Sequence, residues 1–235
     1  MPVNPDADIE VTAYAWVPEM AQGFVKDMRV RWALEEIGLP YRERLVSGDI
    51  GGEKSAEHLA DQPFGQVPVY KEAGLTLFES GAILIHIGDK DECLLPRDPQ
   101  SRARAISWMI AALNSIEPFT QALFMIGMVS AGKTWQHEAI AAVRPFAERR
   151  LAQLSAVLGQ KDWLEDRFTI GDLVMIDVLR AARAPGLVAA HPNLIAYVER
   201  GTARPAFKAA IAAQLAVFAE NAPKPVIHTE TESGM

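Results

Sequence analysis

The sequence has little cysteine, no long apolar run and no excess of basic charge. Its 235 residues include one cysteine, Cys93, which excludes an internal disulfide and favours a reducing compartment. No stretch approaches the roughly 18 uninterrupted apolar residues of a membrane span, and the acidic, proline-containing N-terminus lacks the apolar segment of a secretory signal. We therefore expect a cytoplasmic protein with no membrane partner.

Charge and ligand spacing exclude two further classes. Lys and Arg number 23 against 30 Asp and Glu, giving a net charge of −7 without a basic stripe, so no nucleic-acid partner is expected. The 5 histidines are scattered, with no ligand spacing among them or with Cys93, so no metal is expected. Because Cys93 has no nearby base in the sequence, it is interpreted as structural.

The first 90 residues mix strand and helix patterns. Strand patterns, rich in β-branched and aromatic residues, occur at residues 9–16, 41–46, 67–71 and 75–78. Helical spacing occurs at residues 26–37 and from Ser80, a candidate cap, to about Gly88, and one short helix is expected within residues 47–65. Gly74 supplies the turn of a hairpin between the last two strands. This order predicts a small α/β domain over residues 1–90.

The rest of the chain shows no strand pattern. A proline-containing linker at residues 91–100 precedes a domain predicted to be all-helical over residues 101–222, and residues 223–235 have the composition of a flexible tail. The helical segments expected are 101–122, 136–158, 170–184, 192–201 and 204–220. Thr169 and Asp172 have the spacing of a capping box, with Phe168 and Leu173 placed as a hydrophobic staple, so a helix start is predicted there.

Two short segments contain residues that suit a ligand. Pro68 lies where a strand should begin, which leaves the main chain of Val67 free to pair with an extended ligand, or marks an ordinary tight turn. Glu79 and Ser80 open the following helix, whose free N–H groups can hold a carboxylate. An ordinary helix cap with a dipole-favoured acid explains the same pair of residues.

Together these segments resemble the glutathione transferase family, in which an apolar residue precedes a cis-proline and a Glu/Gln-Ser pair begins the third helix. The Leu94-Leu95-Pro96 linker and the Thr169–Asp172 capping box also match, and residues 30–36 (Val-Arg-Trp-Ala-Leu-Glu-Glu) are similar to bacterial members. The resemblance covers about residues 9–220. It implies a thioredoxin-like domain followed by a helical bundle, a homodimer and a role in detoxification.

The resemblance also implies roles for particular residues toward glutathione, the expected co-substrate. The Val67 main chain would pair with the cysteinyl unit, Glu79 would meet the γ-glutamyl ammonium, and Ser80 would hold the γ-glutamyl carboxylate. Gln66 would reach the tripeptide as well. The thiolate would then attack a small apolar electrophile.

The residue that activates the thiol is less apparent, because residues 17–25 contain no Ser, Cys or Tyr. Tyr14, at the end of the first strand, is the predicted catalytic group, with packing in the strand as its alternative. Gln22, or free N–H groups near it, is another candidate, and Trp16 would wall the site. Trp108 and Ala112 are predicted to line the substrate pocket, although a stripe at helical spacing is more often core.

Other functions are also considered. Residues 127–134 (Gly-Met-Val-Ser-Ala-Gly-Lys-Thr) fit a phosphate-binding loop, and residues 173–177 imitate the accompanying strand with its aspartate. That motif needs a parallel sheet around it, whereas both segments continue helical patterns, so a nucleotidase is rejected in favour of a helix–loop–helix connection. A glutathione-dependent isomerase, dehalogenase or reductase, and a non-catalytic binding or stress module on the same fold, are the alternatives to a transferase.

Overall fold

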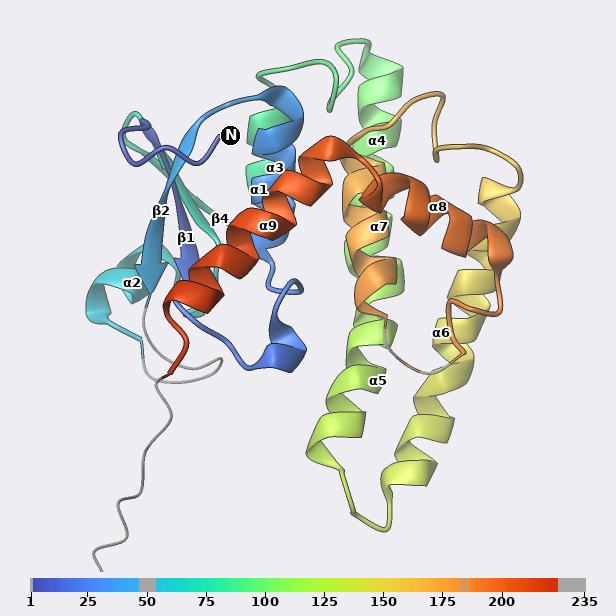
Figure 1. The fold of residues 1–235 in the computed structure, drawn as a ribbon. Coiled ribbons are helices and arrows are strands. Elements are labelled where there is room, and N and C mark those ends of the chain that lie inside the picture. The colour runs from blue at the N-terminus through green and yellow to red at the C-terminus, as the bar shows by residue number, and fades with distance from the viewer. Residues whose placement is uncertain (1, 47–53, 183, 185, 224–235) are drawn as a thin grey trace, which may run out of the picture.

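The protein combines a small sheet with a larger set of helices. The computed structural model describes residues 2–46, 54–182, 184 and 186–223 (Figure 1). The sheet and helices α1 and α3 form one part, and helices α4 to α8 the other, while α9 runs back across α1 (Figure 1). The predicted fold class, α/β followed by all-α, is confirmed. Most of the predicted tail, and part of the segment 47–65, lie outside the described residues.

Four strands form one mixed sheet in the order β2-β1-β3-β4. They are β1 (Ile9–Tyr14), β2 (Tyr41–Val46), β3 (Val69–Glu72) and β4 (Leu75–Phe78). β1 pairs with β2 in parallel and with β3 antiparallel, and β3 pairs antiparallel with β4. β3 begins at Val69 and not at Val67, because Pro68 has no N–H to donate to a ladder. β1 ends at Tyr14, two residues earlier than expected.

The turn between β3 and β4 has the predicted glycine and one further residue of the same conformation. Ala73 and Gly74 have φ values of 47° and 83°, both in the left-handed region. Two consecutive residues with positive φ are typical of the turns that suit the right-handed twist of a hairpin. The hairpin thus brings the C-terminal end of β4 beside the start of β3, where Pro68 lies.

The helices of the first part are α1 (Asp27–Ile37), α2 (Ala56–Asp61) and α3 (Ser80–Gly88), and a 3-10 turn, η1, covers Glu19–Ala21. The expectation that Ser80 caps α3 is wrong. The N-cap position is Glu79, with φ of 70°, and no side chain caps the helix. Ser80 instead places its hydroxyl 3.4 Å from Nη1 of Arg29, so this oxygen is held by a neighbouring helix.

The second part is built from long helices. They are α4 (Pro99–Ala111), the π-helical turn η2 (Ala112–Ile116), α5 (Glu117–Val129), α6 (Gln136–Leu158), α7 (Ile170–Ala181), α8 (Pro192–Thr202) and α9 (Pro205–Glu220). The first predicted helix, residues 101–122, is therefore too short. Pro118 has no N–H for the helical ladder, and the wider turn of η2 lets the chain pass this residue and continue to Val129.

The helical stretch Pro99–Val129 is long and apolar enough to be compared with a membrane span. It is 31 residues long with a mean hydropathy of 1.2 in its most apolar window, so by length and composition it passes for a membrane span. One such helix is weak evidence, because core helices of soluble proteins pass the same test. Here 28% of that window is buried inside the protein.

The predicted capping box at the start of α7 is confirmed. The Thr169 side chain accepts from the main chain of the first turn, and the Asp172 carboxylate accepts from Thr169 N–H at 2.9 Å. The staple between Phe168 and Leu173 stays a prediction. Residues 127–134 form the end of α5 and the turn before α6, so the helix–loop–helix interpretation holds, and Asp177 lies on α7.

α7 lies at the centre of the hydrophobic core. Its residues 170–179 are all buried, and the core is continuous from the sheet to the outer helices. Trp32 of α1 packs edge-on against Phe207 of α9 at 4.9 Å between ring centroids, and lies 5.7 Å from Phe168. These contacts fix α1 against the helical part, so the side chains at the start of α1 have defined positions relative to α5 and α7.

Candidate functional site

A cavity of about 760 Å³ lies where the sheet meets the helical part. That volume is within the usual range of small-molecule sites. Its walls come from the C-terminal end of β1, the start of α1, the segment before β3, the start of α3, η2 and α5. Five of the eight predicted site residues line it: Tyr14, Gln66, Val67, Glu79 and Ser80.

Val67 presents unpaired main chain to the cavity. The Val67-Pro68 peptide is cis, as the sequence resemblance implies. On one side His58 Nε2 contacts the Gln66 carbonyl at 3.0 Å, and on the other Thr12 Oγ1 accepts from Val69 N–H at 2.5 Å. Within the described part of the chain, no hydrogen-bond partner is found for the N–H or C=O of Val67. These groups are therefore available to an extended ligand.

The buried imidazole of His58 is neutral and binds the turn before Val67. Burial lowers the pKa of His58, and with one ring proton its Nε2–H donates to the Gln66 carbonyl. Sequence patterns did not single out this residue. The only sequence signal is its place on the short helix before the Gln-Val-Pro segment, and that signal does not specify a partner.

The start of α3 borders the same cavity. The first main-chain bond of this helix runs from Ile83 N–H to the Glu79 carbonyl, so the N–H groups of residues 80–82 have no partner within the helix. These groups and the positive end of the helix dipole favour an anion. Glu79 adds a carboxylate to the cavity wall, which suits an ammonium group. The pair can therefore receive a zwitterionic end group.

Tyr14 closes the strand side of the cavity. Its ring packs in a small apolar cluster that also contains Val25 and Val67, and Lys54 Nζ lies 4.6 Å from the ring centroid. Burial and the nearby Asp27 carboxylate raise the pKa of Tyr14, so its phenol keeps its proton near pH 7. Tyr14 thus lines the cavity with a protonated phenol that can donate a hydrogen bond.

Five charged side chains from the start of α1, from α5 and from α7 form a network of ion pairs, and three of them, Lys26, Arg29 and Glu117, line the cavity. We call it the charge cluster; its members are Lys26, Arg29, Glu117, Asp177 and Arg180. Arg29 Nη2 lies 2.8 Å from Glu117 Oε1, and Arg29 Nε lies 2.7 Å from Asp177 Oδ2. Arg180 Nη2 lies 2.8 Å from Asp177 Oδ1, and Lys26 pairs with Glu117.

Sequence patterns missed this cluster. Lys26 and Glu117 are 91 residues apart, and Arg29 and Asp177 are 148 apart. Nothing local marks the two carboxylates as partners of α1, and Asp177 was noted only for its place in a false nucleotide motif. Their positions depend on how α1 packs against α5 and α7.

The remaining wall is apolar. It contains Leu113 of η2, three residues of α5 and residues of the loop before α1. The side chains are Pro18, Met20, Phe24, Leu113, Phe124, Met125 and Met128. Methionines adapt their shape to an apolar ligand, so this wall suits an apolar compound of variable outline.

Three predicted residues are not among those lining the cavity. Ala112 is fully buried in the core, and Trp108 packs beside Gly171 of α7 with its Nε1–H donating to Glu165 at 2.9 Å. From the stretch formed by α4 and η2, Leu113 is the residue that lines the cavity. Trp16 packs against the cluster around Tyr14, because the chain leaves the strand at Tyr14 and the alternation of sides stops there.

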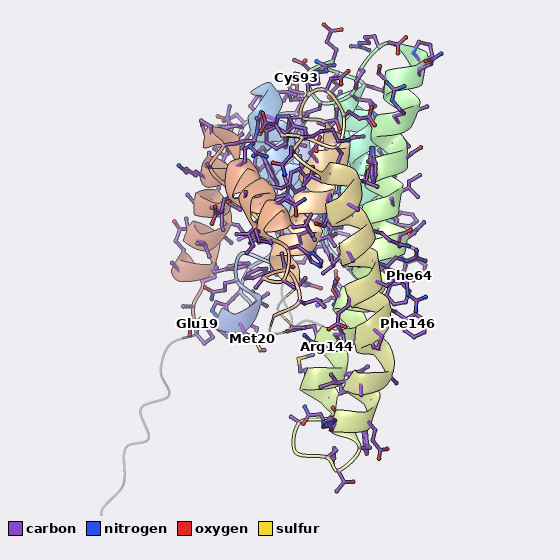
Figure 2. All side chains as sticks on the ribbon, turned by 90° about the vertical axis from the view of Figure 1, so that its right-hand side faces the viewer. Glu19, Met20, Phe64, Cys93, Arg144 and Phe146 are labelled. Atoms are coloured by element: carbon purple, nitrogen blue, oxygen red, sulfur yellow. The ribbon has the colours of Figure 1, made fainter. Side chains whose placement is uncertain are left out.

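The cysteine is far from the cavity. Cys93 lies near the top of the molecule in Figure 2, well above Met20, which lines the cavity. Desolvation and a hydrogen bond to Asp91 raise the pKa of Cys93 to about 11, so it carries little thiolate near neutral pH. Within the described ranges, no group of His, Cys, Asp and Glu side chains has the arrangement of a metal site.

Comparison with known proteins matches both parts of the chain. The family model for the glutathione S-transferase N-terminal domain matches residues 11–89, and that for the C-terminal domain matches residues 119–205. A glutathione S-transferase of Hyoscyamus muticus is 31% identical over 200 residues, covering 78% of this chain and 92% of that protein. Glutathione S-transferase 3 of Zea mays is 32% identical over 203 residues, covering 79% and 88%.

A solved structure shows the same fold. A glutathione transferase of Burkholderia graminis, with two glutathione molecules bound per subunit, superposes with a TM-score of 0.75 over 90% of each chain at 24% identity.

Proposed function

We propose, because this chain belongs to the glutathione S-transferase family, that its cavity holds glutathione in the polar part and an apolar electrophile against α5. The chain is a glutathione transferase, as its family models and relatives support. The observation that carries the assignment to this cavity is the free main chain of Val67 bordering the same space as the start of α3.

Two of the three units of the tripeptide, the cysteinyl and the γ-glutamyl, have matching groups. The cysteinyl main chain pairs with the N–H and C=O of Val67, which is a short piece of strand addition. Ser80, its N–H and the neighbouring N–H groups of α3 receive the γ-glutamyl carboxylate, and Glu79 receives the ammonium of the same unit. Gln66 lines the cavity beside Val67 and contacts the peptide.

The chemistry is attack by the thiolate on an electrophilic carbon. With chlorodinitrobenzene, for example, the sulfur forms a bond to the ring carbon, and chloride leaves with the bonding electrons. Tyr14 donates a hydrogen bond to the sulfur, which stabilises the thiolate over the thiol. The apolar wall removes the electrophile from water and places it next to the sulfur.

Wild-type protein tests this assignment directly. Isothermal titration with reduced glutathione should give measurable heat, and a panel of electrophiles should show conjugation. Heat without conjugation on any member of the panel would support a non-catalytic binding module. No heat with glutathione would remove the site altogether.

Replacing Tyr14 with phenylalanine should raise the pKa of bound glutathione by about 1 to 2 units, because a hydrogen bond to a charged group contributes about 1.5–3 kcal/mol. The conjugation rate near pH 7 should fall roughly tenfold to a hundredfold. Thiolate absorbance titrated against pH measures the first quantity and steady-state kinetics the second. An unchanged pKa would show that Tyr14 only packs the strand.

Several broader properties remain part of the proposal. The division at residues 91–100, the cytoplasmic location and the detoxifying role are those expected of the family. A homodimer is supported by two neighbouring exposed aromatic side chains: Phe64 is 69% exposed and Phe78 is 37% exposed, with 6.3 Å between their ring centroids. Analytical ultracentrifugation at micromolar concentration would decide the oligomeric state, and a monomer would contradict the proposal.

A further inference from the structure

The charge cluster contains one positive charge more than its carboxylates balance. When Lys26 is protonated, three cations, Lys26, Arg29 and Arg180, contact two carboxylates, Glu117 and Asp177. The cluster is largely shielded from water, so an unbalanced charge within it is poorly screened. An anion bound in the cavity would restore the balance.

Among the cations of the charge cluster, Lys26 is the one whose charged group is most exposed to the cavity. Arg29 is 1% exposed and contacts both carboxylates, and Arg180 also donates to the Gly23 carbonyl at 2.6 Å. The Lys26 side chain is 36% exposed, and within the part of the chain that the structure describes it forms an ion pair with Glu117, which it shares with Arg29. Lys26 is also the N-cap residue of α1, so its main chain lies at the positive end of that helix.

The position of Lys26 relative to Ser80 matches the layout of the tripeptide. Arg29 Nη1 lies 3.4 Å from Ser80 Oγ, and its other amino group contacts the same Glu117 carboxylate that Lys26 contacts. One guanidinium and one carboxylate thus separate the two residues. Beyond Glu117, α5 carries the apolar residues Phe124 and Met125. A sulfur placed between the glutamyl end and the apolar wall would lie in the part of the cavity that Lys26, Arg29 and Glu117 line.

We propose that the Lys26 ammonium faces the glutathione sulfur and is the counter-ion of its thiolate. The inference rests on the proposed function, since it assumes glutathione in the polar half of the cavity. It adds to Tyr14 a second group at the sulfur, one that the sequence analysis did not indicate.

The proton balance of this step is simple. Burial and the positive charge of Arg29 lower the pKa of Lys26 to about 7, with Asp177 opposing them. The neutral amine can therefore accept the thiol proton near neutral pH: the S–H bond breaks, an N–H bond forms, and an ammonium–thiolate pair results. The two groups titrate as a coupled pair. The other titratable groups that line the cavity are Tyr14, Glu79 and Glu117. The remaining charged groups near Lys26 are the ion-paired side chains of Arg29, Asp177 and Arg180.

The test compares Lys26→Met, Lys26→Arg and a control variant, Lys208→Met, on the exposed face of α9. Thiolate absorbance of bound glutathione is titrated against pH, and isothermal titration measures binding of glutathione and of S-methylglutathione, which has no ionisable sulfur. In Lys26→Met the pKa of the glutathione thiol should rise by about 1 to 2 units. At pH values below this pKa, the fraction of bound glutathione present as thiolate should then be about tenfold to a hundredfold smaller. Lys26→Arg and Lys208→Met should keep the wild-type thiol pKa within about half a unit.

S-methylglutathione separates the possible anions. Its affinity should change less than about twofold in Lys26→Met, because the charge that Lys26 meets is absent from this ligand, and unchanged binding also shows that the variant is folded. A loss of S-methylglutathione affinity as large as that of glutathione would assign Lys26 to a carboxylate of the tripeptide and overturn the inference. An unchanged thiol pKa in Lys26→Met with normal glutathione binding would overturn it while leaving the proposed function in place.

Discussion

Replacing Asp172 with alanine is expected to lower the free energy of unfolding by about 3–5 kcal/mol, because it leaves several buried donors without an acceptor. The carboxylate is fully buried and accepts four hydrogen bonds. Oδ1 accepts from Leu164 N–H and from the Tyr197 hydroxyl, both at 2.8 Å. Oδ2 accepts from Thr169 N–H at 2.9 Å and from the Thr169 hydroxyl at 3.2 Å.

Asp98 provides a matched control, because it caps another helix of the same domain at the surface. Its carboxylate accepts from Ser101 N–H at 2.9 Å, and exposed donors can turn to water when it is removed. Asp98→Ala should therefore cost much less free energy of unfolding than Asp172→Ala. Urea unfolding followed by circular dichroism measures both variants. Equal losses would mean that Asp172 acts only as a local cap and does not tie α7 to the Leu164 loop and α8.

The features that the sequence predicted well are those decided by nearby residues. The start of α7 depends on Thr169 and Asp172, three positions apart, and the β3–β4 turn depends on Gly74 and its neighbour. The Val67-Pro68 segment and the Glu79-Ser80 pair could be assigned to one site only because the family resemblance implies that these two segments lie close together in the fold. Their contacts with glutathione are still predictions.

The features that the sequence did not predict depend on packing between distant elements. A helical stripe at Trp108 and Ala112 has the spacing of a pocket wall, but which face meets the cavity depends on the position of α7. The division of the helical stretch into α4, a π turn and α5, around Pro118, was also not predicted. Ser80 looked like a cap because the sequence could not show that Arg29 would lie within hydrogen-bond distance of its hydroxyl.

Changing Glu79 to glutamine should weaken glutathione binding roughly 10- to 150-fold, because a hydrogen bond between charged groups is worth about 1.5–3 kcal/mol. The side chain keeps its shape, so the backbone conformation at this position is unchanged and the loss reports on the charge. Glu57→Gln, at an exposed site on α2, removes the same charge and should leave the affinity within about twofold. Isothermal titration measures all three proteins, and equal affinities would remove Glu79 from the site.

Glu79→Gly separates the ligand role of this residue from its effect on the fold. Glu79 has φ of 70°, a conformation that costs a residue with a side chain about 1–3 kcal/mol and costs glycine little. Since glycine also makes the unfolded chain more flexible by up to about 1 kcal/mol, we expect the free energy of unfolding to rise by about 1 kcal/mol. Glutathione affinity should fall at least as far as in Glu79→Gln. A variant that is more stable but binds worse would show that the strained glutamate serves the ligand; a less stable variant would show that its side chain holds the start of α3 in place.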